Sequence, residues 1–226
     1  MNSTIVFVRH GEADCNIVRQ FDKHNVFSDL TARGREQARI TGEWLVKWQG
    51  AHGSFKSFYS SYYLRATQTA QEVGGIFSQV GILVPNIIED ALLAEANRGI
   101  YHSFPYEEVA RLYPGELDRK KKEGKYHHRP LGGENWPDVE VRVRLFLDML
   151  YQQYSEERIL VFTHSNWLYL LKKILLNISP WEIVEEYDNK ETFANASVLV
   201  CQEVIKDGGR RLIIDQGPFV PWEGRI

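Results

Sequence analysis

The stretch TIVFVRHGE, residues 4–12, determines which fold the chain can adopt. Its first five residues are apolar or β-branched, which is typical of a strand buried on both faces of a sheet. Arg9 and His10 follow directly, and Gly11 ends the run. The stretch therefore predicts a buried strand whose carboxyl end presents an arginine and a histidine. We expect Gly11 to let the next turn pass close to a ligand, because glycine has no Cβ.

A second stretch of the same kind, ILVFTHS, lies at residues 159–165. It is again an apolar run, and it ends at His164. Ligands of open α/β sheets gather where the strands have their carboxyl ends. If the two strands are parallel neighbours, His10 and His164 lie together at that edge. The two stretches therefore predict a site built around two imidazoles.

Strands and helices alternate along the rest of the chain. Further strands are predicted at residues 57–60, 86–89, 198–204 and 212–214, and helices at residues 31–50, 65–77, 139–150, 168–176 and from 180 onward. This alternation is typical of a mostly parallel sheet with helices on both faces. We expect a three-layer α/β/α fold in a single domain, residues 1–226, because no flexible linker interrupts the chain. Residues 95–133 lack a regular apolar pattern and are expected to form a small inserted cap.

Composition and charge narrow the class of protein. The 226 residues are 43% hydrophobic and 25% charged, which is enough to bury a full core. The formal net charge is −3, so no overall positive field favours nucleic acid as a partner. The first apolar run is too short for a membrane span or a secretion signal. We therefore expect a cytoplasmic protein that binds neither nucleic acid nor membranes.

Two further residues extend the predicted site. Arg65 follows the strand at residues 57–60, and Glu95 follows the strand at residues 86–89. Two guanidinium groups at one sheet edge favour a phosphate, which they bind in a bidentate manner. A neutral imidazole can attack the phosphorus, arginines stabilise the transition-state charge, and a glutamate can protonate the leaving oxygen. The set predicts phosphoryl transfer that needs neither a metal nor a cofactor.

The same residues also have simpler interpretations. A lone histidine at a strand end is more often structural than catalytic, but a buried Arg9 beside it needs an anion partner. A cysteine-based phosphatase would need an arginine six residues after its thiol. The positions six residues after Cys15 and Cys201 are Phe21 and Asp207, so neither cysteine is indicated as a nucleophile. No zinc motif of the HExxH type occurs either.

The motifs resemble those of the histidine phosphatase superfamily, which has the phosphoglycerate mutase-like fold. Five blocks of the family pattern occur in order: Val8–Glu12 with Asn16; Leu30-Thr31 with Gly34 and Gln37-Ala38; Ser60-Ser61 with Arg65-Ala66 and Gln68–Ala70; Gly132–Glu134 with Asp138-Val139; and Thr163-His164. The resemblance covers most of the chain and is closest to the phosphatase-type branch 1. It implies an enzyme that is a metal-independent phosphoric monoester hydrolase.

The resemblance also implies a role for each matching residue. By it His10 accepts the phosphoryl group and forms a phosphohistidine. Glu95 is the proton donor, and the remaining matches bind phosphate: Arg9, Asn16, Arg65 and His164.

The chain departs from the family pattern at two places. Tyr62-Tyr63 stands before Arg65 where the family usually has Pro-Leu, and Ser165 replaces the usual glycine after His164. The Ser165 hydroxyl has two candidate roles, a donor to the phosphate or a cap of the following helix, and we expect the cap.

The resemblance leaves a choice between hydrolysis and isomerisation. In mutases of the family the glutamate is followed by an arginine and a tyrosine that grip the substrate, whereas Ala96-Asn97 follows Glu95 here. We therefore expect a phosphomonoesterase that hydrolyses a small phosphorylated metabolite. A 2,3-bisphosphoglycerate-dependent phosphoglycerate mutase is the alternative. A catalytically weak domain that binds a phosphate ligand in regulation is the second alternative.

The cap carries a basic run and two adjacent histidines. Charge runs are usually solvated, so Arg119–Lys122 is expected to face solvent, although these residues could add positive charge over the pocket. His127 and His128 are expected on the cap surface, and Arg129 is a candidate substrate contact. The oligomeric state stays open, with a homodimer as one option.

Overall fold

The structure, a computed structural model, describes residues 2–17, 25–206 and 208–226. Within these residues, six strands form one sheet in the order β3-β2-β4-β1-β5-β6. The strands are β1 (Thr4–Arg9), β2 (Ser57–Ser60), β3 (Ile87–Glu89), β4 (Arg158–Thr163), β5 (Val198–Lys206) and β6 (Gly209–Phe219). The first four are parallel, while β5 is antiparallel to β1 and to β6. The predicted mostly parallel sheet is confirmed, although β6 is far longer than the three residues expected.

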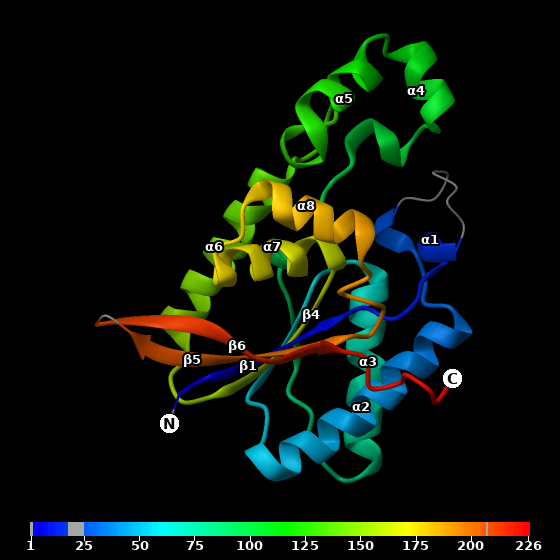
Figure 1. Cartoon of the computed structure of the whole chain (residues 1–226). Coiled ribbons are helices and arrows are strands. Elements are labelled where there is room, and N and C mark those ends of the chain that lie inside the picture. The colour runs from blue at the N-terminus through cyan, green and yellow to red at the C-terminus, as the bar shows by residue number, and fades with distance from the viewer. Residues whose placement is uncertain (1, 18–24, 207) are drawn as a thin grey trace.

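The helices cover both faces of this sheet. They are α1 (Asp14–Ile17), α2 (Ala32–His52), α3 (Leu64–Gln79), α4 (Tyr106–Leu112), α5 (Glu116–His127), α6 (Trp136–Gln153), α7 (Ser165–Leu176) and α8 (Pro180–Asn189), with single 3₁₀ turns η1 (Asn25–Phe27), η2 (Ala91–Leu93) and η3 (Gly99–His102). Figure 1 shows α2 and α3 on one face and α6, α7 and α8 on the other. The predicted three-layer α/β/α arrangement is confirmed.

Strand β1 packs against both helical layers because its side chains alternate between the faces. Ile5 and Phe7 belong to the apolar cluster that includes residues of α6 and α7. Val6 and Val8 belong to the second cluster, with residues of α2 and α3. All four side chains are at most 2% exposed, so an uninterrupted apolar run was the right signal for a central strand.

Helix starts follow the predicted chemistry at two places and depart from it at a third. The Thr31 side chain accepts the Gly34 N–H at the start of α2, and Ser179 forms a capping box with Glu182 at the start of α8. The expected cap by Ser165 is wrong, because α7 begins at Ser165 itself and His164 occupies the N-cap position. The Ser165 hydroxyl is thereby left beside the site.

Residues 95–133, which we call the cap segment, are helical rather than irregular. They contain η3, α4 and α5, and Figure 1 shows α4 and α5 standing away from the sheet above α8. Helix α5 has no apolar stripe; along it Arg119 pairs instead with Glu116 three residues earlier and Glu123 four residues later. A search for apolar periodicity cannot find a helix of this composition, which is why the sequence pattern missed it.

Candidate functional site

The two predicted histidines meet at the carboxyl ends of β1 and β4. The strands are parallel neighbours whose register pairs Arg9 with Thr163. The His10 N–H continues this register and donates to the Thr163 carbonyl at 3.0 Å. The two imidazole centroids lie 5.1 Å apart, and both side chains are buried. The predicted convergence of His10 and His164 is therefore confirmed.

The hydrogen bonds of His10 determine which ring nitrogen is free to react. Nδ1 lies 2.7 Å from the Gly11 carbonyl oxygen, which can only accept, so Nδ1 carries the proton. Nε2 then has a lone pair, and it accepts the Nε–H of Arg65 at 3.0 Å. The imidazole thus presents a basic nitrogen to a guanidinium, in the orientation a nucleophile needs.

The electrostatics of the site keep both imidazoles uncharged. Burial lowers the pKa of His10 well below its ordinary value of 6.5, and the positive charges of Arg65 and Arg9 lower it further. Burial also lowers the pKa of His164, with Arg65 as the next cause. A neutral imidazole is the form that can attack an electrophile.

His164 is held by the loop after β2. Its Nε2 lies 2.8 Å from the Ser61 hydroxyl, while its buried Nδ1 has no hydrogen-bond partner among the described residues. The Ser61 oxygen already accepts the Tyr63 N–H at 3.2 Å, which leaves its proton available for Nε2. In that arrangement Nδ1 carries a proton and is a free donor for an anion.

Two guanidinium groups are buried at the same edge. Arg65 is 2% exposed and Arg9 is 8% exposed, and burial lowers the pKa of each. Arg9 donates to the Phe193 carbonyl and lies 3.9 Å from Glu191, but its buried Nε has no partner among the described residues. A buried cation with a free donor, such as Arg9, favours an anionic ligand.

Glu95 lies at the same site. Its side chain is buried and accepts the Ala96 N–H at 2.9 Å. The Glu95 charge is the largest influence that raises the pKa of Arg9, and it also raises the pKa of Arg65. The carboxylate is therefore within electrostatic reach of both guanidiniums, as a proton donor beside the phosphate would be.

The packing of Gly11 adds a second reason for a glycine at this position. A Cβ on Gly11 would lie 2.4 Å from the Gly34 carbonyl oxygen, and a Cβ on Gly34 would lie 1.9 Å from the Glu12 carbonyl oxygen. The missing side chains let the turn after β1 pack against the start of α2, and the close approach to a ligand stays a prediction. The Gly11 N–H is then held by the Thr69 hydroxyl of α3 at 3.0 Å.

Three other predicted site residues lie at different distances from this centre. Asn16 is exposed and connects to it through Asn195, which donates both to Asn16 Oδ1 and to the His10 carbonyl. Ser165 lines a hollow that Arg9 also lines. Arg129 is exposed and pairs with Asp138 at the start of α6. Asn16 and Ser165 stay predictions as phosphate ligands, and Arg129 stays a prediction as a substrate contact.

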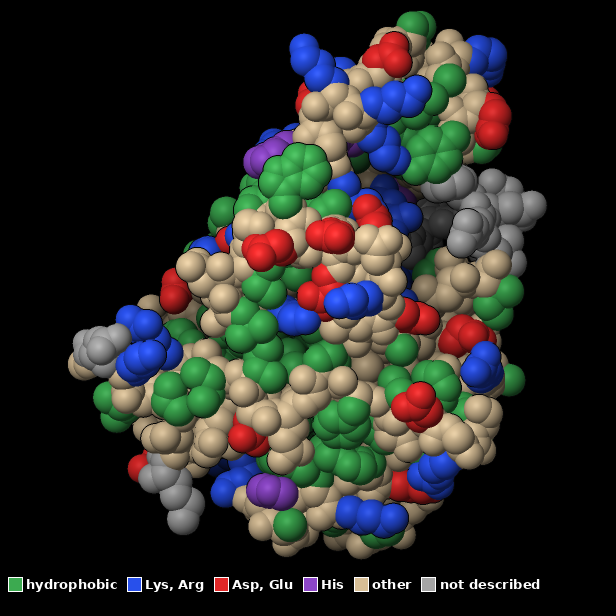
Figure 2. Space-filling view, in the orientation of Figure 1, with side chains coloured by type: hydrophobic (Ala, Val, Ile, Leu, Met, Phe, Trp, Pro, Cys, Tyr) green, Lys and Arg blue, Asp and Glu red, His purple; other side chains and the backbone are tan. Residues whose placement is uncertain are grey.

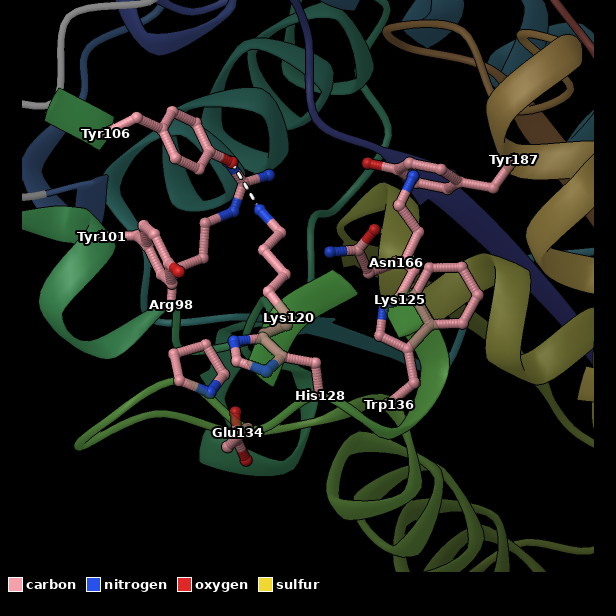
Figure 3. Close-up of a pocket in the computed structure, with 12 residues that line it drawn as sticks. Arg98, Tyr101, Tyr106, Lys120, Lys125, His128, Glu134, Trp136, Asn166 and Tyr187 are labelled. Carbon is pink, nitrogen blue, oxygen red and sulfur yellow. Dashed lines mark hydrogen bonds between the residues drawn. The ribbon is translucent and has the colours of Figure 1, made fainter. Parts of the chain in front are cut away.

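A cavity of about 280 Å³ opens between the cap segment and α8 and was not predicted. We call it the cap pocket; its lining residues share a basic and aromatic character and include Arg98, Tyr101, Tyr106, Lys120, Lys125, Trp136 and Tyr187 (Figure 3). Lys120 therefore faces the pocket rather than solvent, while Lys121 and Lys122 are exposed as expected. The predicted surface position of His128 is also wrong, because it is buried between Glu116 and Glu123.

The described part of the chain holds no group of three or more His, Cys, Asp or Glu side chains that could bind a metal ion. Both cysteines are free thiols. Cys201 is buried, and burial raises the pKa of its thiol well above the ordinary value. Cys15 is half-buried.

Together the fold and the site define an α/β protein whose parallel strand ends bring two histidines and two arginines together. Comparison with known proteins makes the class more specific. The family model described as the histidine phosphatase superfamily (branch 1) matches residues 5–203, so the chain belongs to that superfamily.

Individual relatives agree with this assignment. The chain is 30% identical over 187 residues to a 2,3-bisphosphoglycerate-dependent phosphoglycerate mutase of Rhizobium meliloti, covering 82% of this chain and 85% of the mutase. The solved structure of Bacillus stearothermophilus YhfR aligns with a TM-score of 0.74 at 22% identity, covering 97% and 99% of the two chains. A mycobacterial glucosyl-3-phosphoglycerate phosphatase in complex with VO3 aligns with a TM-score of 0.69 at 24% identity, covering 95% and 98%. The two structures support the fold.

Proposed function

We propose that the protein hydrolyses a phosphomonoester of a small metabolite through a phosphohistidine on His10. The single observation that carries the proposal is the state of the His10 ring. Its Nδ1 proton is held by the Gly11 carbonyl, and its Nε2 lone pair faces the Arg65 guanidinium at 3.0 Å. A buried neutral nucleophile beside two buried guanidiniums is suited to a dianionic phosphate ester.

In the first step the phosphate ester displaces the Arg65–His10 hydrogen bond. Arg9, Arg65 and the His164 Nδ1–H bind the nonbridging oxygens, which frees the His10 Nε2 lone pair. Nε2 attacks the phosphorus and forms the N–P bond while the bond to the ester oxygen breaks. Glu95 donates its proton to that oxygen, and a neutral alcohol leaves. The arginines stabilise the charge that spreads over the phosphoryl oxygens.

In the second step the Glu95 carboxylate removes a proton from water. The water oxygen attacks the phosphorus, the N–P bond breaks, and the electron pair returns to Nε2 of His10. Inorganic phosphate is released and Glu95 is protonated again, so each cycle consumes one water and one ester. These steps use side chains of this chain alone, and metal independence is part of the proposal.

The test is a burst experiment with p-nitrophenyl phosphate. Rapid mixing should release about one nitrophenolate per protein molecule before steady turnover, and quenching should trap an acid-labile phosphoprotein. The His10→Asn variant should show neither signal. Turnover in wild type with an acid-stable phosphoprotein, or a burst that survives in His10→Asn, would contradict the proposal.

The mutase alternative is favoured by one observation. Glu95 is not directly followed by the arginine and tyrosine that mutases of the family have. Arg98 and Tyr101, a few residues later in the chain, line the cap pocket instead. The relative from Rhizobium meliloti is also a mutase by name. Incubation with 3-phosphoglycerate plus 2,3-bisphosphoglycerate separates the reactions. We expect release of phosphate; rapid isomerisation without release would replace hydrolysis by mutase activity.

A binding or regulatory domain without turnover is the remaining alternative. It predicts binding of phosphate esters with no burst and no phosphate release, so the same experiments exclude or establish it. None of the described helices has the length and apolar character needed to cross a bilayer. A cytoplasmic location, a homodimer and the lack of a nucleic-acid partner stay predictions.

A further inference from the structure

The loop between α8 and β5 is bonded to the residue that precedes the nucleophile. We call residues 193–197 of this loop the bracing segment. The Arg9 N–H donates to the Ser197 carbonyl at 3.1 Å, and the Arg9 guanidinium donates to the Phe193 carbonyl. The bracing segment therefore holds both the backbone and the side chain of Arg9.

The bracing segment also holds the backbone of His10. The His10 carbonyl accepts the Ala196 N–H at 3.0 Å and the side-chain amide of Asn195 at 3.1 Å. A carbonyl oxygen has two lone pairs, so these two donors satisfy it. Loss of the Asn195 amide would remove one of the two donors from the backbone of a buried residue, the one that carries the nucleophilic nitrogen.

The backbone of the bracing segment is strained at Ala196. Its φ is +52°, in the left-handed region that favours glycine, and the residue is buried. The Thr41 hydroxyl of α2 donates to the Ala196 carbonyl at 3.1 Å, and the Trp222 indole N–H donates to the Asn195 carbonyl at 2.7 Å. Strain of this kind persists where the surrounding contacts impose it, often at functional sites. The segment is therefore fixed in one conformation from α2 and from the C-terminal residues.

The Asn195 amide also orients the amide of Asn16. The Ala13 N–H donates to Asn16 Oδ1 at 3.0 Å, and a backbone N–H can only donate, so this atom of Asn16 is the oxygen. Asn195 Nδ2 lies 3.3 Å from that oxygen and 3.1 Å from the His10 carbonyl oxygen, which can only accept. Both contacts therefore identify the NH2 end of Asn195. Because the Asn16 oxygen already accepts two donors, its NH2 group is the end that can donate to an anion.

Uncharged amides supply the direction that cations at an anion site do not. Figure 2 shows Lys and Arg side chains gathered where the surface is hollowed below α4 and α5. Charges attract an anion over a distance, whereas a hydrogen bond constrains the angle at which the two groups meet. A displacement of about 1 Å in a catalytic group can cost about 100-fold in rate. Hydrogen bonds that fix His10 and Asn16 are therefore expected to affect the reaction as well as folding.

We propose that Asn195 is a positioning residue of the phosphoryl-transfer site, whose amide fixes the His10 backbone for attack and turns the Asn16 NH2 group toward the phosphate. This inference rests on the proposed function, since it concerns how the same site is held. Asn195 acts through these two neighbours and does not itself bind the phosphate. It lies outside the five motif blocks of the chain, so only the folded structure brings it to the nucleophile.

The first test measures the two effects of Asn195 separately. Calorimetric titration of inorganic phosphate measures anion binding, and the rate of the nitrophenolate burst from p-nitrophenyl phosphate measures attack by His10. Asn195→Ala should weaken phosphate binding about tenfold and slow the burst about 10- to 100-fold. Either measurement unchanged in a folded Asn195→Ala protein would overturn the inference.

A double-mutant cycle shows through which neighbour Asn195 acts. Asn16→Ala should weaken phosphate binding about tenfold, and adding Asn195→Ala should weaken it less than about twofold further, because the amide that Asn195 orients is already gone. The burst should still slow on adding Asn195→Ala, because the bond to the His10 carbonyl is lost in either background. Additive losses of phosphate binding would contradict action through Asn16.

Asn195→Asp gives a signature in the pH profile. An ionised carboxylate of nearly the same size would place an acceptor against the His10 carbonyl and Asn16 Oδ1, which are acceptors themselves. The burst at pH 7.5 should therefore be at least as slow as in Asn195→Ala. Protonation below about pH 5 returns one donor, so the rate relative to wild type should rise as the pH falls from about 7.5 to about 4.5. A constant ratio would contradict the role of the amide as a donor.

Thr41→Val is the matched structural control. It removes the hydrogen bond to the Ala196 carbonyl in the same segment and leaves the bonds to His10 and Asn16 in place. It should lower the urea midpoint while phosphate binding and burst rate stay within about twofold of wild type. Kinetic losses in Thr41→Val equal to those in Asn195→Ala would show that Asn195 supports folding alone, and the inference would fail.

Failure of the proposed function would be visible separately. If wild type gives no burst, or His10→Asn retains it, the hydrolysis proposal fails, and the phosphate titrations of the cycle still decide whether Asn195 orients Asn16. If the burst in wild type behaves as expected but Asn195→Ala matches it in both measurements, hydrolysis stands and the positioning role is wrong.

Discussion

The site at the carboxyl ends of β1 and β4, which we call the strand-end site (Arg9, His10, Arg65, Glu95 and His164), and the cap segment hold their charged side chains in different ways. At the strand ends, Arg9 and Arg65 are buried, and the backbone register of β1 and β4 fixes the histidine beside them. In the cap segment, ion pairs along one exposed helix do the positioning, as in Arg119 with Glu116 and Glu123. The contrast indicates that the sheet fixes the side chains at the strand ends, whereas the side chains of the cap segment can change without disturbing the core.

The largest effect is expected from removing the nucleophile. His10→Ala should lower phosphate release from p-nitrophenyl phosphate by about 10³-fold or more, because Nε2 of the other imidazole, His164, is already bonded to the Ser61 hydroxyl. Steady-state kinetics and circular dichroism measure activity and folding together. His52→Ala, which changes an exposed histidine at the end of α2, should retain full activity. A His10→Ala protein as active as wild type would show that His10 is not the nucleophile.

Glu95→Gln tests whether Glu95 protonates the leaving oxygen while His10 attacks the phosphorus. Loss of the general acid should slow cleavage of an alkyl phosphate by about 10²- to 10⁴-fold. The burst with p-nitrophenyl phosphate should fall much less, since nitrophenolate leaves without a proton. Rapid-quench kinetics on both esters measures the loss of rate on each ester, and the ratio of the two losses is the test. Equal losses on the two esters would show that Glu95 does not protonate the leaving oxygen.

Gly34→Ala probes the packing that supports the strand-end site. The added Cβ would lie 1.9 Å from the Glu12 carbonyl oxygen, so the turn after His10 must shift. We expect a loss of about 2 kcal/mol in the free energy of unfolding, with lower activity. Gly75→Ala is the matched control in α3, where a Cβ meets open space. It should be neutral or stabilising by about 0.5–1 kcal/mol, measured by urea denaturation.

A change in stability without any substitution is expected from pH. The pKa values of His10 and His164 are lowered in the folded state, so below pH 6.5 the unfolded chain binds protons that the folded chain does not. The free energy of unfolding should therefore fall as pH drops from 6.5 toward 5, by about 1 kcal/mol per pH unit for each histidine. Urea midpoints measured across this window test it. Added phosphate should raise stability at each pH by binding the folded state. A flat profile would contradict the buried, neutral state of the two imidazoles.

The sequence by itself determined the sheet and the chemical groups at its edge. Uninterrupted apolar runs specify central strands because both faces must be covered, and the polar residue that ends each run must lie at the strand's carboxyl end. That argument alone predicts that His10 and His164 lie at the same edge of the sheet. The starts of α2 and α8 were equally local, since Thr31 and Ser179 bond backbone groups within three residues.

Only the tertiary structure decided the contacts that depend on packing between distant segments. The close approach of Gly11 to Gly34 has no local signal in the sequence, and Ser165, which we expect to cap a helix, is the first residue of that helix. The direction of Lys120 follows from how α5 packs over the site, and a charged helix leaves no apolar periodicity from which that packing can be inferred. The local sequence pattern determines which residues form a helix or strand and where it ends. The direction in which a half-exposed cation such as Lys120 points is determined by the helices and loops that pack around it.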